Sequence, residues 1–142
     1  KKGEPFKKWL AEIGDFIANK KTPEFAAEFA MMERAFASFN SIVDMNAAWT
    51  TTNKQLKQLF ATRIMHAAAR VICGKLMLDQ GLLAASKLAE LGDSHFDANF
   101  YKGKIASVKF YIMNVVPEIF GTEEAMKAAD TSAIDCPEDA FM

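Results

Sequence analysis

Apolar residues recur every three or four positions through most of this chain, and that spacing constrains its fold more than any other feature. Such a period puts side chains on one face of an α-helix, whereas a half-buried strand needs alternation at every second residue. Only 7 Gly and 4 Pro interrupt the 142 residues, so long helices are expected. The sequence shows no alternating run and no internal repeat, and it therefore predicts an all-α fold.

Four helical segments are predicted, at about residues 5–19, 22–49, 54–91 and 96–121. Each carries one stripe of residues that is expected to face the core. The four stripes are, in order, Phe6, Trp9, Leu10, Ile13, Phe16 and Ile17; Phe25, Phe29, Met32, Phe36, Phe39 and Val43; Leu56, Leu59, Phe60, Ile64, Ala67, Val71, Gly74, Leu78, Leu82, Ala85 and Leu88; and Phe96, Phe100, Gly103, Ser107, Phe110 and Asn114.

The whole chain, residues 1–142, would form one domain with an irregular tail at 130–142. Short connections between the helices favour an up-down-up-down four-helix bundle. A turn is expected at 50–53, where three threonines and an asparagine are poor helix formers, and Gly121 should end the fourth helix. The other boundary signals are Thr22 as a cap and Pro23 in the first turn of the second helix, Ser94 and Asp97 as a capping pair before the fourth, and Pro117, which should bend or loosen its last turn.

Small residues within the third stripe predict close packing. Gly74 and Gly81 each cost about 1 kcal/mol in a helix relative to Ala, and a neighbouring helix that approaches closely would explain them. Cys73 lies in the same apolar stretch and is expected to be a small core residue. With only Cys73 and Cys136 there is no disulfide framework, which suits a reducing compartment, most simply the cytoplasm.

Charge and hydropathy exclude several classes of function. The net charge of -1 gives no electrostatic case for binding nucleic acid, and no stretch reaches the roughly 18 apolar residues of a transmembrane span. Lysines near the start favour a solvated helix face, with a membrane-surface module as an alternative: Lys1, Lys2, Lys7, Lys8, Lys20 and Lys21. Because the chain begins with Lys1 rather than Met, we expect it to be cut from a longer protein.

The sequence presents no recognisable catalytic centre. A di-iron bundle needs a Glu three residues before a ligating His, and neither His66 nor His95 has one. The Cys-x-x-Cys-His motif of covalent haem is also missing. We therefore predict no catalytic, cofactor-binding or metal-ligating residue in this chain, and we expect capping or solvation to explain His95.

His66 supports one alternative function, that of a phosphoacceptor in a stand-alone four-helix signalling or interaction module. Phosphotransfer domains carry one exposed His on a helix, and Arg70 at the fourth position after His66 could steady a phosphoryl group. A partly buried His at a helix seam is the favoured interpretation. The alternative requires that His66 be exposed to solvent.

Three segments near the end carry a resemblance to a known family. They read FYKGKIA at 100–106, FYIMNVVP at 110–117 and PEDAF at 137–141. In this order they are similar to the end of bacterial acyl-CoA dehydrogenases that have an extra helical domain after the flavoprotein core, above all the group that resembles the methylmercaptopropionyl-CoA dehydrogenases. The apolar helix that contains Gly74 also resembles this domain.

The resemblance implies an accessory C-terminal domain without an active site of its own. The parent enzyme would use FAD to oxidise an acyl-CoA to a 2-enoyl-CoA, with a Glu upstream of Lys1 as base and an electron-transfer flavoprotein as electron acceptor. The domain would brace the flavoprotein core or the interface of a homo-oligomer. Lys102 and Lys104 could meet a phosphate or an acidic surface, although ordinary exposed lysines are favoured, and Gly103 would mark a close helix crossing.

Overall fold

The computed structural model describes residues 3–140, and the prediction of an all-α fold is confirmed for them. Helices alone make up the regular structure of this part of the chain. They are α1 (Glu4–Asn19), the 3-10 turn η1 (Pro23–Phe25), α2 (Ala26–Thr52), α3 (Lys54–Leu59), α4 (Ala61–Leu91), α5 (Ala98–Phe110), the π-helical turn η2 (Tyr111–Val115), α6 (Glu118–Ala128) and α7 (Ser132–Asp135).

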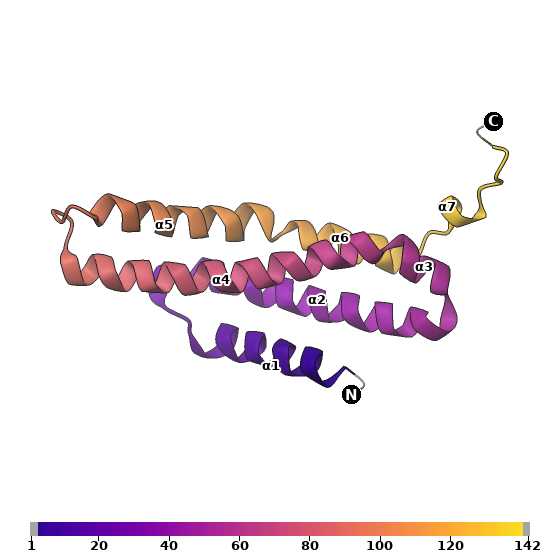
Figure 1. The fold of residues 1–142 in the computed structure, drawn as a ribbon, viewed down its shortest axis with the longest axis horizontal. Coiled ribbons are helices and arrows are strands. Elements are labelled where there is room, and N and C mark those ends of the chain that lie inside the picture. The colour runs from indigo at the N-terminus through magenta and orange to yellow at the C-terminus, as the bar shows by residue number, and fades with distance from the viewer. Residues whose placement is uncertain (1–2, 141–142) are drawn as a thin grey trace.

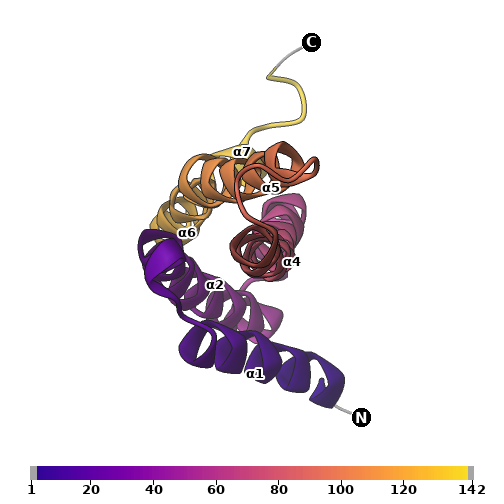
Figure 2. The same cartoon turned by 90° about the vertical axis from the view of Figure 1, so that its left-hand side faces the viewer.

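The long helices run alternately in opposite directions along one axis (Figure 1). Helix α4 packs against α2 and α5, and α2 packs against α6, so these elements surround the core. Helix α1 packs on α2 and α4, on the side of that pair away from α5 and α6 (Figure 2). The predicted irregular tail contains the short helix α7, whose Ile134 packs against the edge of the core, and the chain after α7 extends away from the long helices (Figure 1).

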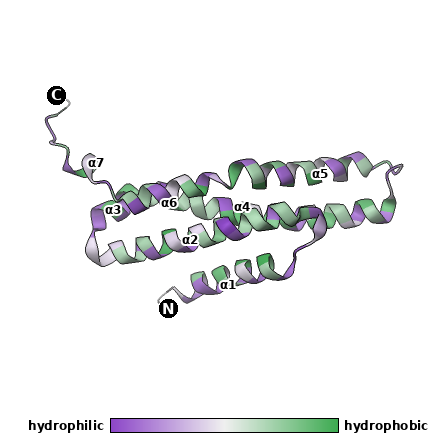
Figure 3. Ribbon diagram, turned by 180° about the vertical axis from the view of Figure 1, so that it is seen from behind, coloured by the Kyte–Doolittle hydropathy of each residue, from purple (hydrophilic) through white to green (hydrophobic). Residues whose placement is uncertain are grey.

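Hydrophobic and hydrophilic residues are interspersed along the long helices, as an amphipathic fold requires (Figure 3). The predicted stripes of the second and third segments reach the core. Phe25, Phe29 and Met32 of the second and Val71 and Leu78 of the third are fully buried. In the first stripe Ile13, Phe16 and Ile17 are buried, but Phe6 is 40% exposed because it lies at the free end of α1.

The predicted close packing at Gly74 and Gly81 is confirmed. A Cβ atom on Gly81 would lie 2.9 Å from the ring of Phe25 and 3.1 Å from the side chain of Val108. On Gly74 it would lie 2.5 Å from the sulfur of Met32. Real Cβ contacts are not this short, so glycine lets α4 approach its neighbours at both positions.

The prediction that the turn spans residues 50–53 was wrong, because the turn is shorter. Helix α2 continues to Thr52, and only Asn53 takes an extended conformation. The hydroxyl groups of Thr50 and Thr52 donate hydrogen bonds to backbone carbonyls one turn earlier, which satisfies them within the helix. The side chain of Asn53 then caps α3 by accepting a hydrogen bond from the backbone N–H of Leu56 at 3.1 Å.

The third predicted helix is divided at Phe60 into α3 and α4. Phe60 is buried and packs against Trp49 with ring centroids 5.4 Å apart, which anchors the bend. The change of direction leaves Leu59 44% exposed, so its prediction as a core residue was wrong. Thr22, predicted as a cap, makes no capping hydrogen bond with its side chain.

Pro117 loosens the helical turn before it, as predicted. Because Pro117 has no N–H, the preceding turn widens into the π-helical segment, in which the N–H of Val116 bonds to the carbonyl of Tyr111 at 3.2 Å. The helix resumes as α6 and runs through Gly121, so the prediction that Gly121 ends it was wrong. The end lies at Ala129, which has a positive φ of 47°.

The predicted inward face of the fourth helix was also wrong. Its fully buried residues are Val108, Ile112, Val116 and Ile119, whereas Phe100 and Phe110 are 61% and 63% exposed. The reason is the short distance between α4 and α5 at Gly81, where Val108 fits and a phenylalanine ring would not. Helix α5 has apolar residues on two faces, and the face with smaller side chains turns inward.

Candidate functional site

An exposed aromatic surface is the most unusual feature of the described structure. We define the α5 aromatic face as Phe96, Phe100, Gly103, Ser107 and Phe110. Phe96 is 96% exposed, whereas Phe29 in the core is fully buried. Phe96 lies in the turn before α5, and the other four residues follow one another at helical spacing on α5, on a side that faces away from buried Val108. Exposed apolar patches of this kind mark interaction surfaces in soluble proteins.

Lysines border the α5 aromatic face. Lys102 pairs with Asp93 at 2.8 Å and Lys109 pairs with Glu24 at 3.5 Å. Lys104 places its ammonium 5.6 Å from the ring centre of Phe100 and 3.4 Å from the amide oxygen of Gln80. The sequence has no Asp or Glu from residue 98 to residue 117, so the surroundings of the face on α5 itself are basic.

A shallow groove joins this face to α4. It has a volume of about 340 Å³ and is lined by Met77 and Gln80 of α4 and by Phe100, Gly103, Lys104 and Ser107 of α5. A Cβ atom on Gly103 would meet nothing within 4 Å, so the predicted crossing of another helix at Gly103 is not formed within residues 3–140. Leu83 of α4 is 63% exposed and extends the apolar surface beyond Phe100.

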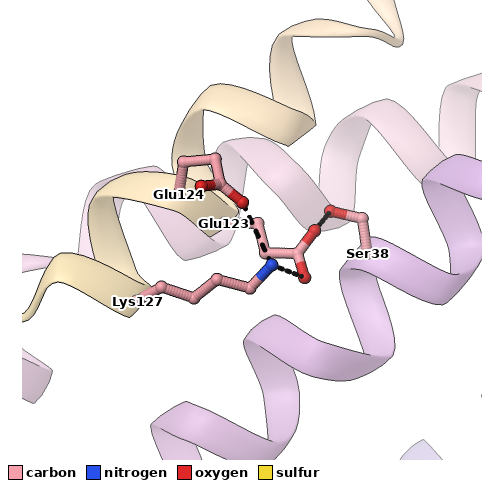
Figure 4. Close-up of polar contacts among 4 residues, drawn as sticks. All are labelled: Ser38, Glu123, Glu124 and Lys127. Carbon is pink, nitrogen blue, oxygen red and sulfur yellow. Dashed lines mark hydrogen bonds and ion pairs between the residues drawn. The ribbon is translucent and has the colours of Figure 1, made fainter.

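A polar contact that the sequence analysis missed joins α2 to α6 (Figure 4). The hydroxyl of Ser38, itself only 5% exposed, donates a hydrogen bond of 2.5 Å to the carboxylate of Glu123. Lys127 forms an ion pair of 3.0 Å with the same carboxylate and another of 3.0 Å with Glu124. The available signals were a Ser inside an apolar stripe and the spacing of four between Glu123 and Lys127.

The surroundings of Glu123 lower the pKa of its carboxyl group. Burial by itself would raise this pKa, because it disfavours the charged form. Hydrogen bonds from Ser38, Lys127 and Ser41 stabilise the carboxylate and outweigh the burial. The arrangement is that of a structural ion pair, and it closes the contact between α2 and α6.

A second polar cluster lies where α4 meets the π-helical turn. Arg70 forms an ion pair with Glu118, and Tyr111 lies close enough to the thiol of Cys73 for the thiol to affect its pKa. Burial, with the Cys73 thiol second, raises the pKa of Tyr111 to about 12. Cys73 is exposed, so the prediction that it is a core residue was wrong: it points to the edge of α4 beside Tyr111, and Gly74 takes the inward position.

The two histidines lie apart from each other and play different roles. His66 is exposed on α4, which meets the requirement for a phosphoacceptor and contradicts the favoured interpretation of partial burial. The guanidinium of Arg70 is already paired with Glu118. His95 is exposed and accepts a hydrogen bond at 3.1 Å from the backbone N–H of Asp97, the residue before α5, but no side chain caps α5, so of the two expected roles solvation fits His95. Ser94 makes no such cap for α5.

The described residues form neither a cluster of metal ligands nor a membrane-spanning helix. Within residues 3–140 no three His, Cys, Asp or Glu side chains come together as metal ligands. None of the helices in the same range is long and apolar enough to cross a membrane. Lys1, Lys2 and Phe141, which belong to the predicted basic start and terminal motif, lie outside these residues.

Comparison with known proteins identifies the family. The family described as "Acetyl-CoA dehydrogenase C-terminal like" matches residues 9–137. Two proteins named butyryl-CoA dehydrogenase from Syntrophomonas wolfei subsp. wolfei are 94% and 68% identical to the chain over all 142 residues. The chain spans only 23% of the length of each of these relatives. It therefore belongs to the acetyl-CoA dehydrogenase C-terminal-like family and is a C-terminal domain of the acyl-CoA dehydrogenase type.

Proposed function

We propose that this chain is the accessory C-terminal domain of an FAD-dependent acyl-CoA dehydrogenase and that it braces the flavoprotein core or the subunit interface. The observation that carries the proposal is the identity of 94% to one part, 23% in length, of a much longer butyryl-CoA dehydrogenase. Since most of that relative lies outside the match, the active site is expected in the part that this chain does not contain.

The name of the relatives suggests butyryl-CoA, or a similar short acyl-CoA, as the substrate of the parent enzyme. When bound, FAD would accept a hydride from the substrate, and a Glu of the core would take the neighbouring proton to leave a 2-enoyl-CoA. We further propose an electron-transfer flavoprotein as the electron acceptor, a homo-oligomeric parent and a cytoplasmic location. The present chain would supply none of the reacting groups.

A bracing role agrees with the way the helices of this domain pack together. Its helices alternate in direction, as in an up-down-up-down four-helix bundle, and we propose that the intact domain acts as one rigid bundle of this kind. The contact of Ser38 with Glu123 fixes α6 on α2, and the close approach at Gly81 fixes α5 on α4. A rigid helical body with exposed apolar surface is suited to support a larger partner.

Truncation of the complete protein tests this function. The complete protein and a version that lacks the region equivalent to residues 9–137 would be purified and compared for FAD content, butyryl-CoA oxidation with an artificial electron acceptor, oligomeric state and melting temperature. We expect the complete protein to hold FAD and to oxidise butyryl-CoA. The truncated version should keep the core chemistry in part but lose thermal stability or dissociate into smaller oligomers.

Two results would contradict the proposal. One is that the complete protein neither holds FAD nor oxidises an acyl-CoA. The other is that truncation leaves stability, oligomeric state and activity unchanged. Incubation of the chain with acetyl phosphate tests the alternative role of His66, for which exposure is the one structural requirement that is met.

A further inference from the structure

The α5 aromatic face has no partner among the residues that the structure describes, although its composition is that of an interface. Aromatic side chains are enriched where proteins bind each other, and few residues contribute more binding energy. Phe96, Phe100 and Phe110 are 96%, 61% and 63% exposed. Exposing three phenylalanine side chains to water is unfavourable unless another surface covers them.

We propose that the α5 aromatic face is the surface through which this domain docks on the flavoprotein core of its own parent enzyme. The inference rests on the proposed function and adds to it the face that makes the contact. The occupant would be an apolar patch of the core, which Phe100 and Phe110 contact, bordered by carboxylates that face Lys104.

The lengths of the relatives support the core as the occupant. Because the chain covers 23% of each relative, the protein surface available to cover this face within one polypeptide is several times larger than the domain itself. A domain joined covalently to its partner meets it at a high effective concentration, so a modest contact suffices for stable docking.

The charges support an acidic border on the occupant and argue against a second copy of α5. No Asp or Glu occurs from residue 98 to residue 117, and Lys102, Lys104 and Lys109 lie along this segment. Lys102 and Lys109 pair with Asp93 and Glu24, so if two copies met through this face the Lys104 side chains would oppose each other without an acidic residue of α5 between them. Lys104 is paired with an amide rather than a carboxylate, at 3.4 Å from Gln80, so its charge remains available to an acidic partner.

The groove beside Gly103 indicates how the core would fit. Phe100 and Ser107 flank Gly103, and a Cβ atom added there would meet nothing within 4 Å. A side chain or helix of the core can therefore approach the backbone of α5 closely at this point. A larger residue at position 103 would keep the two surfaces apart.

Photo-crosslinking in the complete, FAD-containing protein tests the proposal. The photoreactive residue p-benzoylphenylalanine would replace Phe110 in one version and Leu59 in a control version, because Leu59 is an exposed apolar residue outside the face, at the other end of the domain. After irradiation, mass spectrometry identifies the peptide that is joined to each position. We expect position 110 to crosslink to core peptides and position 59 to give at least about tenfold less of that product, the ratio expected when one site is a buried contact and the other is not.

Three results would overturn the proposal. They are a crosslink from position 110 to α5 of a second copy, no crosslink at position 110, or equal yields of core crosslinks from positions 110 and 59. These results remain distinct from failure of the proposed function, because they would be obtained on a protein that holds FAD and oxidises acyl-CoA.

A negative charge placed in the contact provides a second measurement on the complete protein. Phe100→Asp should make protease cleavage between the domain and the core about tenfold faster, since it removes an aromatic contact and adds an acidic residue to an acidic border. Leu59→Asp should leave the rate unchanged. Equal rates in the two variants, with FAD retained in both, would contradict docking through this face.

Discussion

The Ser38 hydroxyl and the Glu123 carboxylate lie 2.5 Å apart, although 85 residues separate them in the chain. The contact fixes α6 on α2 next to the core, and Lys127 pairs with the same carboxylate (Figure 4). Because a buried hydroxyl and a carboxylate satisfy each other here, losing either partner leaves the other short of a hydrogen bond.

Ser38→Ala should lower the free energy of unfolding at pH 7 by about 1–3 kcal/mol, the usual cost of leaving a buried polar group without its partner. The pKa of Glu123 is lowered by folding, so the stabilisation from its carboxylate is present above the ordinary value of 4.5 and is lost as the pH falls through the lowered value. The difference between Ser38→Ala and the natural chain should therefore shrink in acid. Urea denaturation at pH 7 and at a series of acidic pH values measures it.

The matched control is Glu124→Gln, which removes a carboxylate that also pairs with Lys127 but is 73% exposed. It should change stability by less than about 0.5 kcal/mol, as is usual for an exposed pair. If Glu124→Gln cost as much as Ser38→Ala, the contact with Ser38 would not be the stabilising one.

Alanine at two glycines should change stability in opposite directions. Gly81→Ala would force a Cβ atom to 2.9 Å from the ring of buried Phe25, and overpacking of this kind costs about 1–3 kcal/mol. Gly121 is exposed on α6, and a Cβ atom added to it would meet nothing within 4 Å. Gly121→Ala should therefore raise stability by up to about 1 kcal/mol through helix propensity. Thermal unfolding of both variants gives the comparison, and a stabilised Gly81→Ala variant would contradict the close packing.

Tyr111 should ionise at an unusually high pH. Its pKa is raised by burial to about 12, so an ultraviolet titration of the folded chain should show one phenolate that forms near pH 12, and Tyr111→Phe should remove that component. Because folding raises this pKa, the protonated form of Tyr111 contributes stability that is complete below the ordinary pKa of 10.0 and is lost as the pH rises toward 12.

The Tyr111→Phe variant also tests how the raised pKa of Tyr111 affects stability at high pH. It should lose less stability than the natural chain between pH 10 and pH 12, because it has no buried phenol to ionise on unfolding. Identical alkaline unfolding curves for the two chains would show that Tyr111 is not protected by folding.

Replacing two phenylalanines with smaller residues should have very different effects on the stability of the 142-residue chain. Phe29 is fully buried, and Phe29→Ala should cost about 3–5 kcal/mol. Phe100 is 61% exposed, and Phe100→Ser should change stability by less than about 0.5 kcal/mol. Chemical denaturation of both variants tests which face of α5 is inward, and a large loss for Phe100→Ser would reverse the assignment.

The sequence by itself determined the helices and much of the core. In the second and third segments the predicted stripes contain buried residues such as Phe29 and Leu78, although α4 also carries the exposed apolar residues Met65, Leu76 and Leu83 outside its stripe. Gly81 was identified from its cost in a helix, because only close packing offsets that cost. The membership of the family was signalled by the segments at 100–106 and 110–117 and is confirmed by the match to residues 9–137.

Only the tertiary structure decided the rotation of α5 and the boundaries at its ends. Both faces of α5 carry apolar residues at helical spacing, so periodicity could not choose between Phe100 and Val108. The choice depends on the space that α4 leaves at Gly81, which a valine fills and a phenylalanine does not. The pairing of Ser38 with Glu123 was equally beyond the sequence, since contact between residues so far apart arises only when α6 has packed on α2.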